Sequence, residues 1–122
     1  MQRKRVLIVD DERPCLITLK EMLQSDEVAV ETAEDFETAL AKIARREFQV
    51  VITDNWLGNE RNRSGLEVLK YVKKNSPQTK VVVMTGFAYG DFRKRAVELG
   101  ADLLLEKPFS EYLLRRMIES AC

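Results

Sequence analysis

The sequence predicts an α/β fold in which five strands alternate with five helices around a single parallel sheet. Short continuous runs of aliphatic and β-branched residues recur along the chain, and such runs are typical of strands buried on both faces of a parallel sheet. Between these runs, apolar residues recur about three or four positions apart, which is the spacing of an amphipathic helix. The connections are short, so we expect one (βα)5 unit.

Each predicted strand is a run of apolar residues that ends at a polar residue. The strands lie at residues 6–9, 28–32, 50–54, 81–84 and 103–105. The third is a continuous apolar run that ends abruptly in the carboxylate of Asp54. The second differs, because Glu27 and Glu31 lie on one side of it and its valines on the other, which is typical of an edge strand.

A segment with helical periodicity follows each strand. The apolar stripes of the first two helices are Cys15, Leu19, Met22 and Leu23, and Phe36, Ala39, Leu40 and Ile43. Pro14 suits a first helical turn, and Ser64 opens a capping-box pattern for the third helix. We expect Asp91 and Ser110 to cap the last two helices, with Gly100 ending the fourth.

Composition and length indicate one globular domain, residues 1–122, without a membrane segment. Of the 122 residues, 45% are hydrophobic and 33% are charged, and no apolar stretch is long enough to span a bilayer. The start of the chain lacks the apolar core of a signal peptide, so we expect a cytoplasmic protein. The 20 basic residues balance the 20 acidic ones, which argues against direct nucleic-acid binding. Cys15 and Cys122 are expected to be free thiols.

Handedness and burial predict the order of the strands. Right-handed crossovers with helices on both faces give a doubly wound sheet, and the two least buried strands belong at its edges. The order 2-1-3-4-5 meets both conditions and places the first and third strands side by side. Asp10, Asp11 and Asp54 then converge. Such carboxylates need a shared cation, for which oxygen ligands favour Mg²⁺, and Thr85 and Lys107 flank the same crevice.

The residues at these strand ends resemble the receiver domain of two-component response regulators, the chemotaxis-type superfamily with a flavodoxin-like fold. The matching positions are Asp10-Asp11, Asp54, Thr85-Gly86 and Lys107-Pro108-Phe109, after four different strands. The resemblance covers essentially the whole chain. Each match alone is weak, but their joint placement is specific.

The resemblance implies a role for each site residue. Asp54 would be the phosphoacceptor, taking a phosphoryl group from a phosphohistidine. The implied Mg²⁺ ligands are Asp10, Asp11, Asp54 and the backbone carbonyl of Trp56, with Asp10 acting mainly through a bound water. Lys107 would pair with a phosphoryl oxygen, and the Thr85 hydroxyl would donate to the phosphoryl group and pull its loop inward.

The resemblance also implies partners. The donor would be a sensor histidine kinase or a phosphotransfer protein. The output would pass to an attached or partner effector domain, or to a homodimer, and would control transcription. We expect no direct contact with nucleic acid or membrane. We expect no enzyme activity beyond the chain's own phosphorylation and dephosphorylation. From the residues themselves, exposed Ile17 on the first helix, with Leu16 at the margin of its apolar stripe, would contact the kinase, the alternative being that both are scattered surface apolar residues.

Two rivals from other classes share parts of this pattern. A Mg²⁺-dependent phosphohydrolase with an aspartyl-phosphate intermediate usually carries an Asp-x-Asp motif and a cap, whereas the acids at 10 and 11 are adjacent and no insertion is long enough for a cap. A flavodoxin-like cofactor protein would want a phosphate-binding loop after the first strand, where Asp10-Asp11-Glu12 would instead repel a phosphate. Turnover of a small phosphate ester would favour the phosphohydrolase, and a yellow preparation would favour the flavodoxin-like protein.

The sequence departs from the family pattern in three places. Gly65 lies eleven residues beyond Asp54 rather than eight, so the loop through 59–63 is about three residues longer, and a solvated insertion is the simplest interpretation. Leu104 replaces the usual aromatic residue of the fifth strand. Trp56 and Phe87 border the expected path of hydrolytic water, which predicts a long-lived phosphorylated state unless both rings face away from the site.

Overall fold

The computed structural model describes residues 3–55, 65–86, 91–107 and 110–121 and contains a sheet of five parallel strands. The strands are β1 (Lys4–Val9), β2 (Val28–Ala33), β3 (Val50–Asp54), β4 (Lys80–Thr85) and β5 (Leu103–Glu106). Their order in the sheet is β2-β1-β3-β4-β5, so the predicted α/β fold and strand order are confirmed. The two edge positions are held by the strands that the sequence predicted there.

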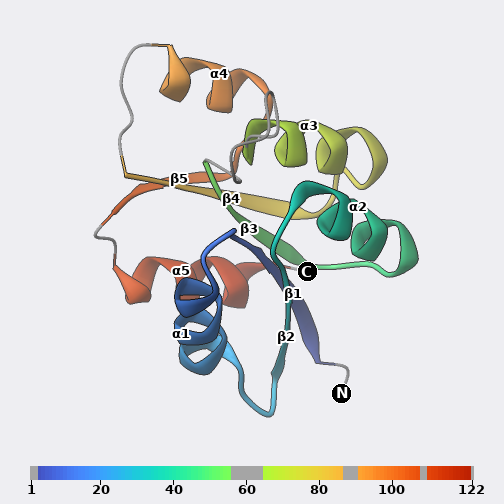
Figure 1. Ribbon diagram of the computed structural model, residues 1–122, viewed down its shortest axis with the longest axis vertical. Coiled ribbons are helices and arrows are strands. Elements are labelled where there is room, and N and C mark those ends of the chain that lie inside the picture. Colours follow the sequence, from blue (N-terminus) through green and yellow to red (C-terminus); the bar gives the residue numbers. More distant parts are fainter. Residues whose placement is uncertain (1–2, 56–64, 87–90, 108–109, 122) are drawn as a thin grey trace.

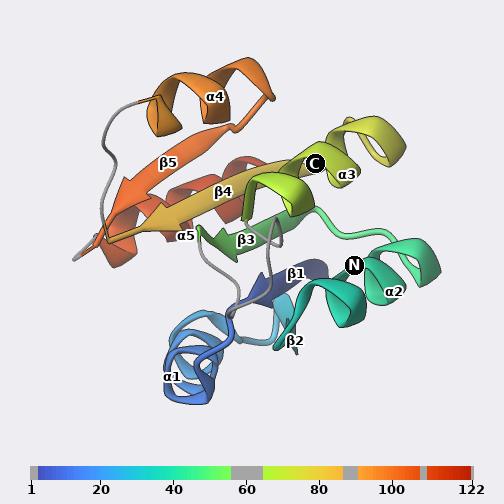
Figure 2. The same ribbon diagram turned by 45° about the horizontal axis from the view of Figure 1, so that its top comes forward.

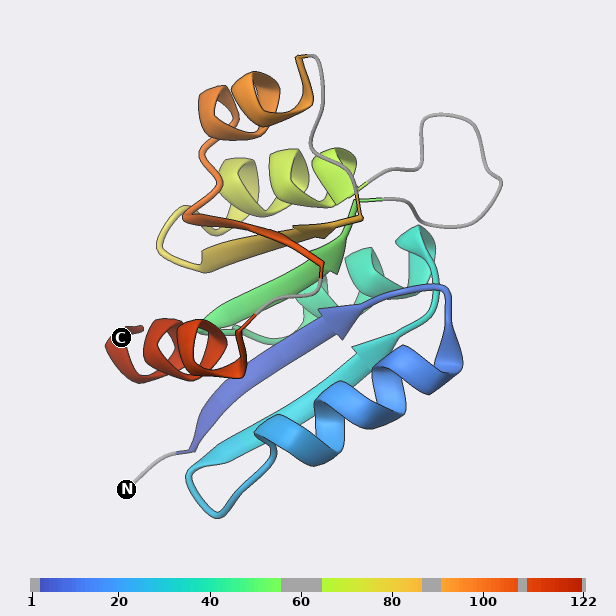
Figure 3. The same ribbon diagram turned by 90° about the vertical axis from the view of Figure 1, so that its left-hand side faces the viewer.

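In the described residues, each strand is followed by a helix, and these five helices cover both faces of the sheet. They are α1 (Arg13–Leu23), α2 (Phe36–Arg45), α3 (Gly65–Asn75), α4 (Phe92–Glu98) and α5 (Glu111–Ser120). Figures 1 and 3 show α1 and α5 on one face, and α2, α3 and α4 on the other. No helix in the described part of the chain is long and apolar enough to cross a membrane.

Alternation along the strands divides the core into two layers. Val6 and Ile8 of β1 pack with Leu16 of α1 and Leu114 of α5, among others. Leu7, the intervening residue, packs on the opposite face, where the second layer includes Leu69 of α3 and Ala96 of α4. The central strands are therefore apolar on both sides, which explains why their sequences are continuous apolar runs rather than alternating ones.

The parallel register brings the polar residues that end the strands to one edge of the sheet. Val9 of β1 pairs with Thr53 of β3, Asp54 pairs with Met84, and Thr85 pairs with Glu106. In Figure 2 the arrowheads of β1, β3, β4 and β5 lie at this carboxyl edge. The first and third strands are neighbours there, although β2 comes between them in the sequence.

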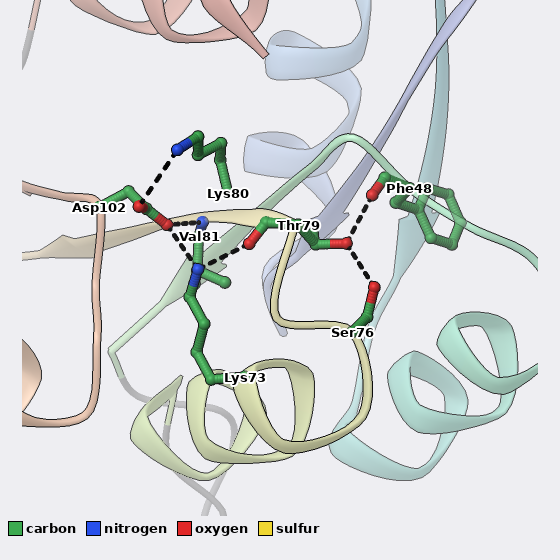
Figure 4. Close-up of polar contacts among 7 residues, drawn as sticks. All are labelled: Phe48, Lys73, Ser76, Thr79, Lys80, Val81 and Asp102. Carbon is green, nitrogen blue, oxygen red and sulfur yellow. Dashed lines mark hydrogen bonds and ion pairs between the residues drawn. The ribbon is translucent and has the colours of Figure 1, made fainter. Parts of the chain in front are cut away.

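The opposite edge of the sheet is fastened by a polar network (Figure 4). Asp102 accepts hydrogen bonds from Lys73 Nζ and from the Val81 backbone N–H, each at 2.8 Å. Lys73 Nζ also donates to the Thr79 carbonyl at 2.7 Å, and the Thr79 hydroxyl donates to the Phe48 carbonyl at 2.7 Å. These bonds tie the end of α3 to the start of β4 and to the loop before β5, because Lys73, Val81 and Asp102 come from these three places.

The helix ends differ in part from the sequence-based expectations. Gly100 has a φ of 99° just after α4 and ends it as predicted. Asp91 and Ser110 occupy the expected N-cap positions, but neither side chain makes a capping hydrogen bond. Asp35 is a cap that was not predicted from the sequence: its carboxylate accepts a hydrogen bond from the Thr38 N–H at 2.7 Å, which lowers the pKa of Asp35. Ser64 lies outside the described residues.

The exposed side of α1 also needs one correction. Ile17 is 57% exposed, as expected for a contact residue. Leu16 is only 4% exposed and packs in the core, so the prediction that it lies at the margin of the apolar stripe was wrong. The stripe of α1 is centred on the buried residues Leu16, Leu19 and Leu23, with Cys15 at its margin.

Candidate functional site

Three carboxylates meet at the carboxyl edge of the sheet. Asp10 and Asp11 follow β1, and Asp54 is the last residue of β3. Each offers an oxygen atom, and these atoms all lie within 4.8 Å of one another. Asp10 is fully buried and Asp54 is 8% exposed, whereas Asp11 faces solvent. The convergence that the strand order predicted is therefore present.

Asp10 is a buried carboxylate whose side chain is only partly hydrogen-bonded. Its Oδ1 accepts from the Glu12 backbone N–H at 3.0 Å, but within the described residues its buried Oδ2 has no hydrogen-bond partner. Burial raises the pKa of Asp10 from 3.8 to about 6, and the charge of Asp54 adds to the rise. A buried carboxylate oxygen without a partner is costly, so a cation would relieve it.

This donor set suits a hard divalent cation. The three groups are carboxylates, which supply only oxygen ligands, and Mg²⁺ accepts one or two protein carboxylates while it keeps several waters. The unpartnered Asp10 Oδ2 is the observation that favours an ion here. The Mg²⁺ that the resemblance implies therefore fits the carboxylates of Asp10, Asp11 and Asp54, which would hold it.

Lys107 supplies the positive charge of the site. Its Nζ donates to Asp54 Oδ1 at 3.0 Å, and its backbone N–H donates to the Thr85 carbonyl at 2.7 Å. Burial lowers the pKa of the Lys107 amine, but the hydrogen bond to Asp54 and the charges of Asp54 and Asp10 raise it, and the net pKa is above its ordinary value. The amine therefore stays protonated at neutral pH.

Thr85 ends β4 next to this cluster. Its side chain is buried, and its hydroxyl accepts a hydrogen bond from Asn55 Nδ2 at 3.3 Å. Thr85 was predicted from the sequence as a site residue, but Asn55 was not. Asn55 directly follows Asp54, which is the only signal in the sequence that could have pointed to it; the contact itself depends on the register of two strands.

The main chain of Asp54 is packed against the start of α3. A Cβ atom on Gly65 would lie 2.1 Å from the Asp54 carbonyl oxygen, so only glycine fits at that position. The Gly65 N–H donates to the Asn55 carbonyl at 2.8 Å, and the Thr53 hydroxyl donates to the Asp54 carbonyl at 3.1 Å. These contacts fix the backbone that presents the Asp54 carboxylate.

Several predicted features lie outside the described residues. They are the Trp56 carbonyl, the ring of Phe87, the loop at 59–63 and the Pro108-Phe109 pair. The role of Trp56 as a metal ligand and the control of water by the two rings remain predictions.

Comparison with known proteins identifies the family. The family model for the response regulator receiver domain matches residues 6–119, so the chain belongs to that family. Receiver domains are generally non-catalytic signalling modules.

Individual relatives agree with this assignment. The chain is 34% identical over 105 residues to the nitrogen assimilation regulatory protein NtrX of Azorhizobium caulinodans, a match that covers 86% of this chain and 23% of that protein. It is 33% identical over 111 residues to the alginate biosynthesis transcriptional regulatory protein AlgB of Pseudomonas aeruginosa, covering 91% of this chain and 24% of that one. The chain thus spans about a quarter of the length of these curated relatives.

A solved structure matches the fold closely. A response regulator protein from Burkholderia pseudomallei, crystallised with a phosphorylated aspartic acid, a calcium ion and citrate, superposes with a TM-score of 0.85 at 28% identity. The match covers 96% of this chain and 67% of that one. The chain therefore shares its architecture with a protein whose structure records both an aspartyl phosphate and a divalent ion.

Proposed function

We propose that this chain is a phosphorylation-controlled switch in which Asp54 accepts a phosphoryl group from a phosphohistidine. The main support for this proposal is the position of the Asp54 carboxylate. Its Oδ1 lies 3.0 Å from the Lys107 amine, and an oxygen of the same carboxylate lies within 4.8 Å of oxygens of Asp10 and Asp11. One carboxylate is thus shared between an ammonium group and a candidate cation site. That arrangement suits an acidic nucleophile that must accept a highly charged group.

Each residue has a defined task in the proposed transfer. A carboxylate oxygen of Asp54 attacks phosphorus, the P–N bond to the donor imidazole breaks, and the imidazole nitrogen leaves with the electron pair and takes a proton from solvent. Lys107 then pairs with a phosphoryl oxygen instead of Asp54 Oδ1, because the transferred group brings negative charge within its reach. When bound, Mg²⁺ neutralises charge on the transferring phosphoryl group.

The proposed donor is a sensor histidine kinase or a phosphotransfer protein that docks on α1. This helix begins three residues after Asp10, and its Ile17 is exposed. A partner that delivers a phosphohistidine to Asp54 must approach this edge. The exposed apolar side chain offers it a contact next to the reaction centre.

The proposed output is a change at the surface formed by α4, β5 and α5. Thr85 is the last residue of β4, the strand that precedes α4 in the chain, and its carbonyl accepts a hydrogen bond from the Lys107 N–H just after β5. Exposed apolar residues lie on the two flanking helices: Val97, Tyr112 and Leu113. An effector domain, attached or separate, or a second copy of the chain could be bound there. The relative AlgB is named a transcriptional regulator, which favours transcription control as the final output.

The test is direct phosphorylation in solution. Incubation with acetyl phosphate and Mg²⁺ is expected to add one phosphoryl mass to the wild type, and none to Asp54→Ala or to the wild type in chelator. Asp26→Ala, which removes an exposed carboxylate two residues before β2, at the opposite edge of the sheet, serves as the matched control and should label normally. Labelling of Asp54→Ala at the wild-type rate would overturn the assignment. Steady turnover of p-nitrophenyl phosphate would instead favour a phosphohydrolase.

A further inference from the structure

The Asn55 side chain contacts Thr85 on the face of the sheet away from the acidic cluster. Asp54 pairs with Met84 in the β3–β4 register, and Met84 packs in the core layer beneath α1 and α5. Successive side chains of a strand point to opposite faces, so the next residues, Asn55 and Thr85, face the α3–α4 side together. Their contact, Asn55 Nδ2 to Thr85 Oγ1 at 3.3 Å, lies on that side.

Asn55 cannot easily follow Thr85 if the threonine moves. The Asn55 backbone N–H donates to the Met84 carbonyl at 2.7 Å, and its carbonyl accepts from the Gly65 N–H at 2.8 Å. These two bonds hold Asn55 between β4 and α3. Its amide contact with Thr85 is already at the long end of the hydrogen-bond range, so a further movement of the hydroxyl would break it.

We propose that Asn55 is a positioning residue that holds the Thr85 hydroxyl away from Asp54 in the resting state. The inference rests on the proposed function, because it supposes that a phosphoryl group on Asp54 attracts this hydroxyl. The phosphoryl group would lie on the α1 side of the edge, with Asp10 and Lys107, whereas the Asn55 amide lies on the α3–α4 side. The Thr85 hydroxyl must leave Asn55 in order to donate to the phosphoryl oxygen.

The contact therefore sets the balance between the resting and activated states. The hydrogen bond is present in the resting state and lost in the activated state. Its net free energy therefore favours the resting state. A typical intramolecular hydrogen bond shifts such an equilibrium by roughly twofold to tenfold. Removing the Asn55 amide should raise the population of the activated state by that factor and should leave the acidic cluster in place.

The experiment measures the affinity for beryllofluoride, a phosphoryl analogue, at fixed Mg²⁺ by titration followed in NMR spectra. Asn55→Ala and Asn55→Ser, whose shorter side chains cannot reach Thr85, are expected to bind it about two- to tenfold more tightly than wild type. Asn75→Ala is the matched control, since Asn75 also makes one amide hydrogen bond, to the Tyr71 carbonyl at 2.9 Å, but on the exposed end of α3. Its affinity should equal that of wild type.

A double-mutant cycle separates positioning from general loosening. In a Thr85→Val background, which keeps the shape but removes the hydroxyl, Asn55→Ala should have no further effect. In the unliganded Asn55→Ala protein, the Thr85 methyl resonance should shift towards its beryllofluoride-bound position. An unchanged or weaker affinity in both Asn55 variants overturns the inference, as does an equal gain in the Thr85→Val background. If wild type binds no beryllofluoride and gains no phosphoryl mass, the proposed function fails and the inference fails with it.

Discussion

The Lys107 amine and the Asp54 carboxylate form an ion pair at 3.0 Å in which Asp54 is almost fully buried and Lys107 is about one-third exposed. The pair joins the ends of β3 and β5, which are not neighbours in the sheet because β4 lies between them. Lys107 thus spans a whole strand to reach Asp54. The two residues are 53 positions apart in the sequence, although their charged atoms are 3.0 Å apart. The ion pair therefore depends on the order of the strands in the sheet and not on a local sequence motif.

Replacement of Lys107 by alanine is expected to leave the protein folded and to slow phosphorylation of Asp54. The partly exposed side chain contributes little packing, whereas loss of one positioned donor to a charged transition state typically reduces the rate by about a hundredfold. The measurement is the rate of phosphoryl gain from acetyl phosphate by intact mass. Lys94→Ala, an exposed lysine on α4, is the control, and a wild-type rate in Lys107→Ala would contradict the assigned role.

The raised pKa of Asp10 predicts how stability depends on pH without divalent ions. The folded-state pKa of about 6 exceeds the ordinary value of 3.8, so the folded protein binds the proton more tightly than the unfolded chain does. The contribution of Asp10 to stability is therefore full below about pH 4 and is lost as the pH rises through 6. At pH 7 the penalty is at most about 3 kcal/mol.

The variant Asp10→Asn should remove this dependence, because an amide does not ionise. Urea unfolding in chelator between pH 4 and 7 is expected to show a smaller loss of stability in Asp10→Asn than in wild type. Addition of Mg²⁺ at pH 7 should raise the free energy of unfolding of wild type more than that of the variant. Parallel pH profiles for the two proteins would show that Asp10 is not the group that titrates.

Gly65 and Gly86 offer a matched test of the close approach between the start of α3 and the Asp54 carbonyl oxygen. Gly65→Ala is expected to destabilise the protein by about 1–3 kcal/mol, because its Cβ would lie 2.1 Å from the Asp54 carbonyl oxygen and the backbone must shift. At Gly86 a Cβ would meet nothing within 4 Å, so Gly86→Ala should change stability by less than about 0.5 kcal/mol. Denaturant unfolding measures both, and equal effects would remove the argument for a close approach at Gly65.

Docking of the phosphoryl donor on α1 predicts a selective defect in Ile17→Lys. A buried apolar contact with a partner would be replaced by a charge, so transfer from the cognate phosphorylated kinase should slow by at least tenfold. Labelling by acetyl phosphate should be unchanged, because Ile17 does not touch the acidic cluster. Val97→Lys places the same change on α4, where the side chain is also well exposed, and should leave the transfer rate near that of wild type. Equal transfer rates in Ile17→Lys and wild type would reject α1 as the docking site.

The parts of the fold that could be predicted were those set by patterns within single segments. Continuous apolar runs predicted the strands, and general rules of handedness then placed Asp10 beside Asp54 without any knowledge of their contact. The position of Leu16 was harder, because a side chain at the margin of a helical stripe can turn either way until the neighbouring helix is in place. Here Leu16 is buried and joins the core layer that also includes Leu114 and Ile118 of α5.

The interactions that could not be predicted join residues from elements that are distant in the sequence. Whether such residues meet depends on how the elements are aligned with one another. The contact of Asn55 with Thr85 requires that β3 and β4 align at the level of one residue. The network around Asp102 requires the loop before β5 to meet both α3 and β4. Asn, Asp and Lys at these positions look like ordinary surface residues in the sequence, since nothing local distinguishes a residue that bridges two elements from a solvated one.

The hydrogen bond from the Gly65 N–H to the Asn55 carbonyl has a consequence for how this protein can vary between species. It closes the chain at both ends of the segment 56–64, so the geometry of Asp54 and of α3 does not depend on how many residues lie between. Lengthening a closed loop from six to nine residues costs only about 0.4 kcal/mol in chain entropy. Insertions and deletions within residues 57–64 should therefore be tolerated, and homologues can differ in the length of this stretch while keeping the backbone positions of Asp54 and Gly65.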